Sequence, residues 1–206
     1  MRQHHVTHCL LAFALVTLAA APAIAGPPLV CHPYDIGNAA SLPWDAQGNS
    51  WKGMRASYPI KRLTGETLAL LTPATPIIVR METLRRAALY ATKDPAVARA
   101  LLTTLLDRAK AKGAERLASF DAGYLAETFK QVEPFSPGTA ALAAGIDGYA
   151  MVAKSLAHGP DPAIEFAAAM ITADGHRGEW AEHVRVARSG ASTDHLLARN
   201  IGNLEQ

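Results

Sequence analysis

The sequence TPIIVRMETLRRAALYATKDPAVARALLTTLLDRAKAK, residues 75–112, decides the fold. Apolar side chains recur every three or four positions on both sides of Asp94-Pro95, which is the period of an α-helix. The two apolar faces comprise Ile77, Met81, Leu84, Ala88 and Ala91, and then Ala98, Leu101, Leu102, Leu105 and Ala109. We predict a helical hairpin that turns at residues 93–95 and buries both faces.

Four helix starts combine a small polar residue with a following proline. They are Thr75-Pro76, Asp94-Pro95, Ser136-Pro137 and Asp161-Pro162. The polar side chain can accept from the free N–H groups of the first turn, and proline suits the first helical position. The helix after Ser136 is expected to continue to Leu156, and Asp194 is expected to cap a last helix.

The polar face of the first helix carries Glu82, Arg86 and Lys93, with Arg80 and Arg85 on its flanks. The spacing predicts that this face meets solvent. Glu82 precedes Arg86 by four residues, so we expect an exposed ion pair worth only ~0.3 kcal/mol.

Two segments of the chain resemble each other at an offset of 67 residues, the difference between Asp94 and Asp161 (161 − 94). Residues 88–102 and 155–169 both contain Asp-Pro-Ala between apolar stretches. The hairpin therefore resembles tetratricopeptide-like helical repeats, whose units span about 34 residues. The resemblance implies stacked antiparallel helix pairs over residues 75–172, although the Trp-Leu-Gly-Tyr signature of that family is missing. A chance match between alanine-rich helices is the alternative.

The composition indicates one globular domain with a substantial core. The chain has 206 residues, of which 50% are hydrophobic, and few are aromatic. Such a length favours a single domain. A formal charge of only +2 gives no reason to expect a nucleic-acid partner.

Residues 1–25 have the pattern of a signal peptide. A 13-residue apolar run, Cys9–Ala21, is followed by Ala23-Ile24-Ala25, which fits the rule for cleavage before Gly26. We expect a periplasmic or secreted protein with no membrane insertion after signal removal; a retained anchor is the alternative. The mature chain would keep one cysteine, Cys31, so no intrachain disulfide is expected.

Residues 26–63 form the predicted N-terminal arm, which precedes a helical domain over residues 64–206. Proline and glycine are frequent in the arm and oppose a helix. Its aromatic side chains bury well, so we expect an ordered, extended arm packed on the helices, with Trp44 and Trp51 as anchors. Pro28–Trp44 and Val79–Ala91 resemble uncharacterised exported bacterial proteins, a resemblance that implies no activity.

The arm also supplies the candidate binding residues, which are Cys31, His32, Tyr34, Asp35, Trp44 and Trp51. A thiolate beside an imidazole can act as a nucleophile or bind a metal. The structural alternative is that Cys31 is a small buried side chain and His32 a satisfied hydrogen-bonding group. A second cysteine at metal-site spacing is missing, so we predict neither a resident metal nor a cofactor.

A second candidate is the set His176, Glu179 and His183. Its spacing suits one helix face and a transition metal. Gly175 and Gly178 indicate that the helix starts near Glu179, which would leave His176 off that face, and a solvated polar face is the alternative.

Two functions are compatible with these features. The first is an exported helical-repeat protein that acts as a non-enzymatic binding or scaffold module for a protein or peptide partner. The alternative is a metal-dependent or thiol enzyme that uses Cys31 and His32. A pocket where these two residues meet a third ligand or base would favour the enzyme.

Overall fold

The computed structural model describes residues 28–45, 52–157, 159–173 and 177–205. The predicted signal peptide and Trp51 lie outside them. The helices are α1 (Pro28–Cys31), α2 (Leu63–Leu70), α3 (Ile77–Ala91), α4 (Pro95–Lys110), α5 (Arg116–Gln131), α6 (Pro137–Ala141), α7 (Gly148–Leu156), α8 (Pro162–Thr172), α9 (Arg177–Gly190) and α10 (His195–Asn200). Two 3₁₀ helices, η1 (Ile60–Arg62) and η2 (Ile201–Glu205), complete the set.

All regular elements in the described ranges are helical, with no strand, which confirms the predicted all-α class. None of the helices in this part of the chain has the length and apolar character needed to cross a membrane.

Three aspartates cap their helices as predicted. Asp94 accepts from the backbone N–H groups of residues 96 and 97, and Asp161 does the same two and three residues on. Asp194 caps α10 in the same geometry. Each carboxylate satisfies N–H groups that the helix itself leaves without a partner.

The predictions for the helix starts at Thr75-Pro76 and Ser136-Pro137 were wrong in part. The Thr75 hydroxyl makes no cap for α3; it donates to the carbonyl of Leu70 at the end of α2. The helix after Ser136 does not continue to Leu156, because α6 stops at Ala141 and α7 begins only at Gly148.

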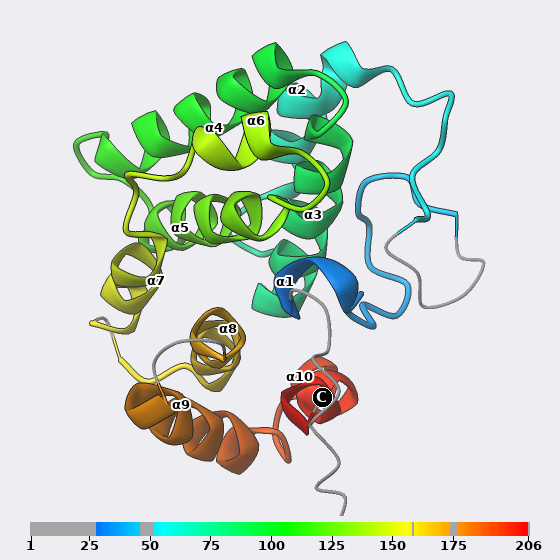
Figure 1. Ribbon diagram of the computed structural model, residues 1–206. Helices are drawn as coiled ribbons and strands as arrows, with labels where there is room; N and C mark the ends of the chain where they lie inside the picture. Colours follow the sequence, from blue (N-terminus) through cyan, green and yellow to red (C-terminus); the bar gives the residue numbers. More distant parts are fainter. Residues whose placement is uncertain (1–27, 46–51, 158, 174–176, 206) are drawn as a thin grey trace, which may run out of the picture.

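Helix α3 lies in the core of the fold, where every one of its residues except Arg86 is buried. It contacts α1, α2, α4, α5 and α8. In Figure 1, α2, α4 and α6 lie above α5, while α8, α9 and α10 form the lower part and α1 lies beside α3. The expected solvent face of α3 is therefore wrong, because residues 28–45 cover the side that carries Glu82 and Arg85.

Helices α5 and α7 approach each other closely at two glycines. A Cβ atom on Gly123 would lie 2.5 Å from the carbonyl oxygen of Gly148, and one on Gly148 would lie 2.4 Å from that of Gly123. No larger side chain fits this crossing, so the contact brings the start of α7 against α5.

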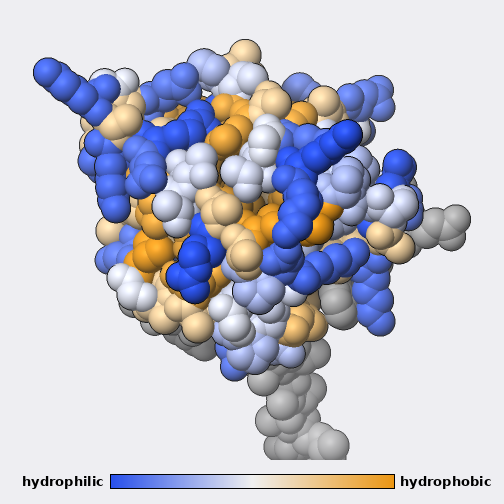
Figure 2. Space-filling view, turned by 90° about the horizontal axis from the view of Figure 1, so that it is seen from above, coloured by the Kyte–Doolittle hydropathy of each residue, from blue (hydrophilic) through white to orange (hydrophobic). Residues whose placement is uncertain are grey.

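The described residues expose few large apolar side chains. Figure 2 shows the face over α2, α4 and α6, where apolar patches are visible between charged side chains. Among the described residues, Phe135 is the one large hydrophobic side chain that is exposed, at 41%. Single exposed apolar residues of this kind are common on soluble domains.

Candidate functional site

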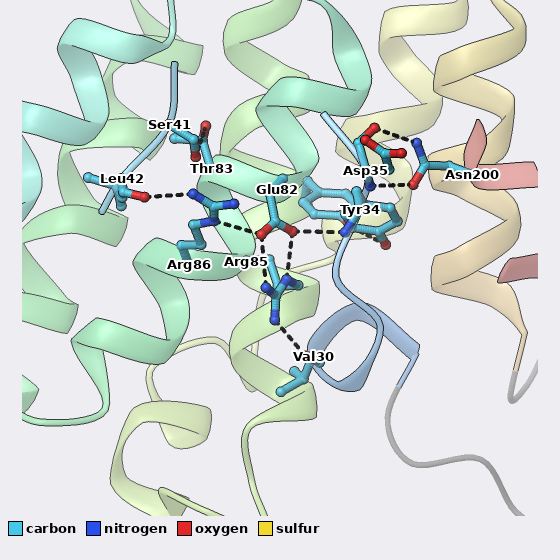
Figure 3. Close-up of polar contacts among 11 residues, drawn as sticks. Val30, Tyr34, Asp35, Ser41, Leu42, Glu82, Thr83, Arg85, Arg86 and Asn200 are labelled. Carbon is cyan, nitrogen blue, oxygen red and sulfur yellow. Dashed lines mark hydrogen bonds and ion pairs between the residues drawn. The ribbon is translucent and has the colours of Figure 1, made fainter. Parts of the chain in front are cut away.

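A buried cluster of charges on α3 holds the segment of residues 28–45, which we call the arm segment. Glu82 is almost completely buried and lies at the centre. Its Oε2 accepts from Nε of Arg85 at 2.7 Å, and its Oε1 accepts from Nη2 of Arg85 at 2.9 Å and from Nε of Arg86 at 2.6 Å. The predicted pair between Glu82 and Arg86 therefore exists, but inside the protein (Figure 3).

The same side chains bind the backbone of the arm segment. The amide of Tyr34 donates to Oε2 of Glu82 at 3.0 Å. Nη1 of Arg85 donates to the carbonyl of Val30 at 3.1 Å, and Nη1 of Arg86 donates to that of Leu42 at 2.7 Å (Figure 3). The carbonyl of Val30 lies in α1, whereas the amide of Tyr34 and the carbonyl of Leu42 lie outside any helix. Backbone groups that secondary structure leaves unpaired need other partners, and here side chains of α3 satisfy them.

The aromatic ring of Tyr34 lies in the core. Its hydroxyl is 2.8 Å from the hydroxyl of Tyr124, and its ring meets Phe166 edge to face at 6.0 Å between centroids. Burial raises the pKa of Tyr34, so the phenol stays protonated. The ring of this predicted binding residue thus anchors the arm segment between α5 and α8.

Asp35 joins the arm segment to α10. Its amide donates to Oδ1 of Asn200 at 2.8 Å, and Nδ2 of Asn200 donates back to the carbonyl of Asp35 at 2.9 Å. The Asp35 carboxylate lies on the surface, where its Oδ1 is 3.4 Å from Nη1 of Arg199. Two segments 165 residues apart in the chain therefore meet at this point.

Cys31 and His32 are both partly buried, at the end of α1 and just after it. Burial raises the pKa of the Cys31 thiol, and the nearby Arg85 charge opposes this shift. Burial, followed by the charge of Arg85, lowers the pKa of the His32 imidazole. A thiol and a neutral imidazole are the forms that these shifts favour, whereas nucleophilic chemistry needs the thiolate.

Trp44 lies over the two arginines that follow Glu82. The guanidinium carbon of Arg85 is 5.0 Å from the Trp44 ring centroid, and that of Arg86 is 5.8 Å away. The ring also meets Tyr90 edge to face. These are cation–π distances, so Trp44 covers the charged cluster.

The second candidate set does not come together in the described residues. His176 lies outside them, and within them no three histidine, cysteine or acidic side chains are grouped so as to hold a metal ion. His183 instead contacts Glu165 of α8 and Tyr149 of α7.

A pocket of about 450 Å³ opens between the arm segment, α3 and α10, and we call it the arm pocket. It is lined by Pro33, Tyr34, Asp35, Ile36, Gly37, Arg86, Arg199, Asn200 and Asn203. Of the predicted binding residues, Tyr34 and Asp35 contribute to it. Arg86 and Arg199 were missed as binding residues, because they lie 41 and 154 residues after Asp45, the end of the arm segment.

The charges around the arm pocket leave an excess of one positive charge. Glu82 forms ion pairs with Arg85 and Arg86, and Asp35 forms one with Arg199. These groups comprise three cations and two anions. The hydrogen bonds of Arg86 use Nε and Nη1, and no acceptor among the described residues bonds to its Nη2. The pocket can therefore bind an anionic group.

Comparisons with family models, curated proteins and solved structures found no match to this chain. The resemblances to tetratricopeptide-like repeats and to exported bacterial proteins therefore stay predictions.

Proposed function

We propose that this protein is an exported binding module and that the arm pocket binds the C-terminal carboxylate of a peptide. The observation that carries the proposal is the pair of guanidinium groups, Arg86 and Arg199, that line one polar pocket of about 450 Å³. Export through the signal peptide of residues 1–25, to the periplasm or the exterior, is part of the proposal.

The chemistry of arginine favours a carboxylate in this place. A guanidinium presents parallel N–H groups whose spacing matches the two oxygens of a carboxylate, and such charge-assisted bonds are short and strong. Arg86 is held by Glu82 and by the carbonyl of Leu42, and its side chain is only 16% exposed. Since its position is set before a ligand arrives, binding would cost little additional side-chain entropy.

The dimensions of the pocket favour a chain end over the surface of a folded protein. A volume of about 450 Å³ lies within the range of small-molecule sites. Asp35 pairs with Arg199 at the rim at 3.4 Å, and both side chains are about half exposed. A ligand carboxylate can therefore replace or share this contact without uncovering a buried charge.

The finer architecture belongs to the same proposal. The two Asp-Pro helix starts, 67 residues apart, have matching caps at Asp94 and Asp161, which supports a degenerate repeat of helix pairs with the arm packed on them. The alternative, a thiol or metal-dependent enzyme, is less well supported, because burial raises the pKa of Cys31.

The test is a melting-temperature screen with acetylated tripeptides that differ in their last residue, each as the free acid and as the amide. A ligand of the folded state raises the melting temperature. We expect at least one acid to raise it and its amide to have no effect. The binding role at the arm pocket would be refuted if no acid raised the melting temperature or if amides worked equally well.

Two variants locate the binding site. Arg199→Gln removes one guanidinium from the pocket, and a lost bond to a charged group of about 1.5–3 kcal/mol should weaken binding of the active tripeptide about tenfold or more. Arg188→Gln is the matched control, because Arg188 is also 51% exposed and pairs with a carboxylate, that of Glu205, away from the pocket lining. Equal affinities of the two variants would place the ligand elsewhere.

A further inference from the structure

Three side chains from three helices form a hydrogen-bonded chain that the arm pocket does not use. The Tyr149 hydroxyl of α7 lies 2.8 Å from Nε2 of His183 in α9. Nδ1 of His183 lies 2.5 Å from Oε2 of Glu165 in α8. The side chains of His183 and Glu165 are only 12% and 14% exposed, so the hydrogen bond between them is largely shielded from water.

The order of the three groups decides which atom can take a proton. An ionised carboxylate can only accept a hydrogen bond, so Nδ1 of His183 carries a hydrogen and donates to Oε2 of Glu165. In the neutral imidazole, Nε2 is then the acceptor, and the Tyr149 hydroxyl donates to it. Proteins deprotonate a hydroxyl by placing an imidazole base beside it and orienting that base with a carboxylate.

Tyr149 also lines a pocket of about 610 Å³. The pocket walls include Glu127 and Lys130 of α5, Asp147 before α7, and Glu179 of α9. Nζ of Lys130 pairs with Oε1 of Glu127 at 2.7 Å. The two remaining carboxylates leave the pocket with a negative charge.

We propose that the Tyr149–His183–Glu165 chain is a proton relay that makes this pocket a hydrolytic site for a carboxylic ester bearing a cationic group. The proposal goes beyond the binding role of the arm pocket and does not depend on it.

The reaction balances with water as the co-reactant. Water attacks the ester carbonyl carbon while its proton passes to Oη of Tyr149 and the phenol proton passes to Nε2 of His183. The resulting imidazolium faces the Glu165 carboxylate. The ammonium of Lys130, which lines the same pocket, would stabilise the negative carbonyl oxygen. The bond to the alcohol then breaks, and the leaving alkoxide takes the proton back along the relay, which yields one acid and one alcohol.

The electrostatics of Tyr149 agree with a proton carrier. Burial raises its pKa, and the charges of Glu179, Glu165 and Asp147 raise it further. The Tyr149 phenol is therefore protonated before the reaction. It gives its proton to Nε2 of His183 only while its Oη receives a proton from water. The same carboxylates attract an ammonium group, and the Tyr149 ring offers a cation–π contact.

The wild-type test is acid release from two acetate esters in a pH-stat. Acetylcholine carries the cation, and 3,3-dimethylbutyl acetate has the same shape without the charge. We expect hydrolysis above the buffer rate, with a higher kcat/KM for acetylcholine. No hydrolysis of either ester overturns the relay, and an equal kcat/KM for both overturns the assignment of a cationic substrate.

Variants separate a relay from a structural contact. Tyr149→Phe keeps the ring and should lower kcat by about 10²–10⁴-fold, the range of general acid–base catalysis. Glu165 is a positioning residue: Glu165→Gln keeps an acceptor for Nδ1 and removes the charge, so kcat should fall while KM stays unchanged. Glu182→Gln, on the same helix as His183 and 61% exposed, is the control for a charge change alone. Unchanged kcat in folded Glu165→Gln, with melting temperature as the check, overturns the relay.

Discussion

The carboxylate of Glu82 accepts a buried hydrogen bond of 3.0 Å from the backbone amide of Tyr34, 48 residues earlier in the chain. This bond joins the centre of α3 to the arm segment, and the same carboxylate orients Arg85 and Arg86. Because Arg86 lines the arm pocket, the interaction that folds the segment also positions a proposed ligand-binding group.

Glu82→Gln should be among the most destabilising single polar substitutions. It leaves Arg85, which is fully buried, without its negative partner, and breaking a buried pair costs ~3–5 kcal/mol. Urea denaturation followed by circular dichroism measures the change. Asp45→Asn is the control, because Asp45 and Arg55 form a pair that is more than half exposed, and such pairs contribute at most ~1 kcal/mol. A loss below 1 kcal/mol in Glu82→Gln would contradict the proposed importance of the cluster.

A second buried pair predicts a dependence of stability on pH. Burial raises the pKa of Asp121 to about 6, and the opposing charge of Arg80, 2.7 Å from Oδ2, does not cancel the shift. In an unfolded chain the pKa of aspartate is about 3.9. Between these values the folded state retains the proton and the unfolded state releases it, so the contribution of Asp121 to the free energy of unfolding falls as pH rises from about 4 to about 6.

The measurement compares wild type with Asp121→Asn, which cannot titrate, by urea denaturation at several pH values. The stability of wild type relative to the variant should decrease from pH 4 to pH 6. A constant difference, or one that increases with pH, would show that burial does not raise the pKa of Asp121 in the folded state.

The close crossing of α5 and α7 predicts opposite effects on stability for alanine at Gly123, which lies in the crossing, and at Gly65, which does not. Gly123→Ala places a methyl group 2.5 Å from the Gly148 carbonyl and should cost ~1–3 kcal/mol through overpacking. Gly65→Ala in α2 meets no atom within 4 Å and should stabilise by ~0.5–1 kcal/mol. Thermal unfolding measures both, and equal effects would contradict the close crossing.

Thr67 carries a buried hydroxyl with no hydrogen-bond partner among the described residues. An unsatisfied buried polar group is costly, whereas an apolar group of the same shape is neutral or favourable. Thr67→Val should therefore leave stability unchanged or raise it by up to ~1 kcal/mol. A loss of stability would show that the hydroxyl has a partner, such as a buried water.

Local sequence patterns predicted where helices begin better than they predicted which helix faces are buried by distant segments. The caps at Asp94, Asp161 and Asp194 involve contacts two or three residues away, so the local sequence contains both partners. The burial of Glu82 and Arg85 depends on residues about 50 positions away. The arm segment meets these charges largely with its backbone, which leaves no pattern of side chains to detect.

The same reason limits the prediction of the sites. Tyr34 and Asp35 were recognised as binding candidates, but the arm pocket forms only where the arm segment meets Arg86 and Arg199. The spacing of Glu179 and His183 drew attention to α9, yet the partners of His183 lie 18 and 34 residues away, on α8 and α7. Helix packing, which the spacing of residues within one helix does not reveal, brings these groups together.

The most direct test of the arm pocket is an amide chemical-shift titration of the ¹⁵N-labelled protein with the tripeptide acid that raises the melting temperature. The account predicts saturable shifts for Asp35, Ile36, Gly37 and Asn200, which line the pocket, and no such shifts with the tripeptide amide. Shifts confined to residues outside the arm pocket, or the same shifts with acid and amide, would contradict it.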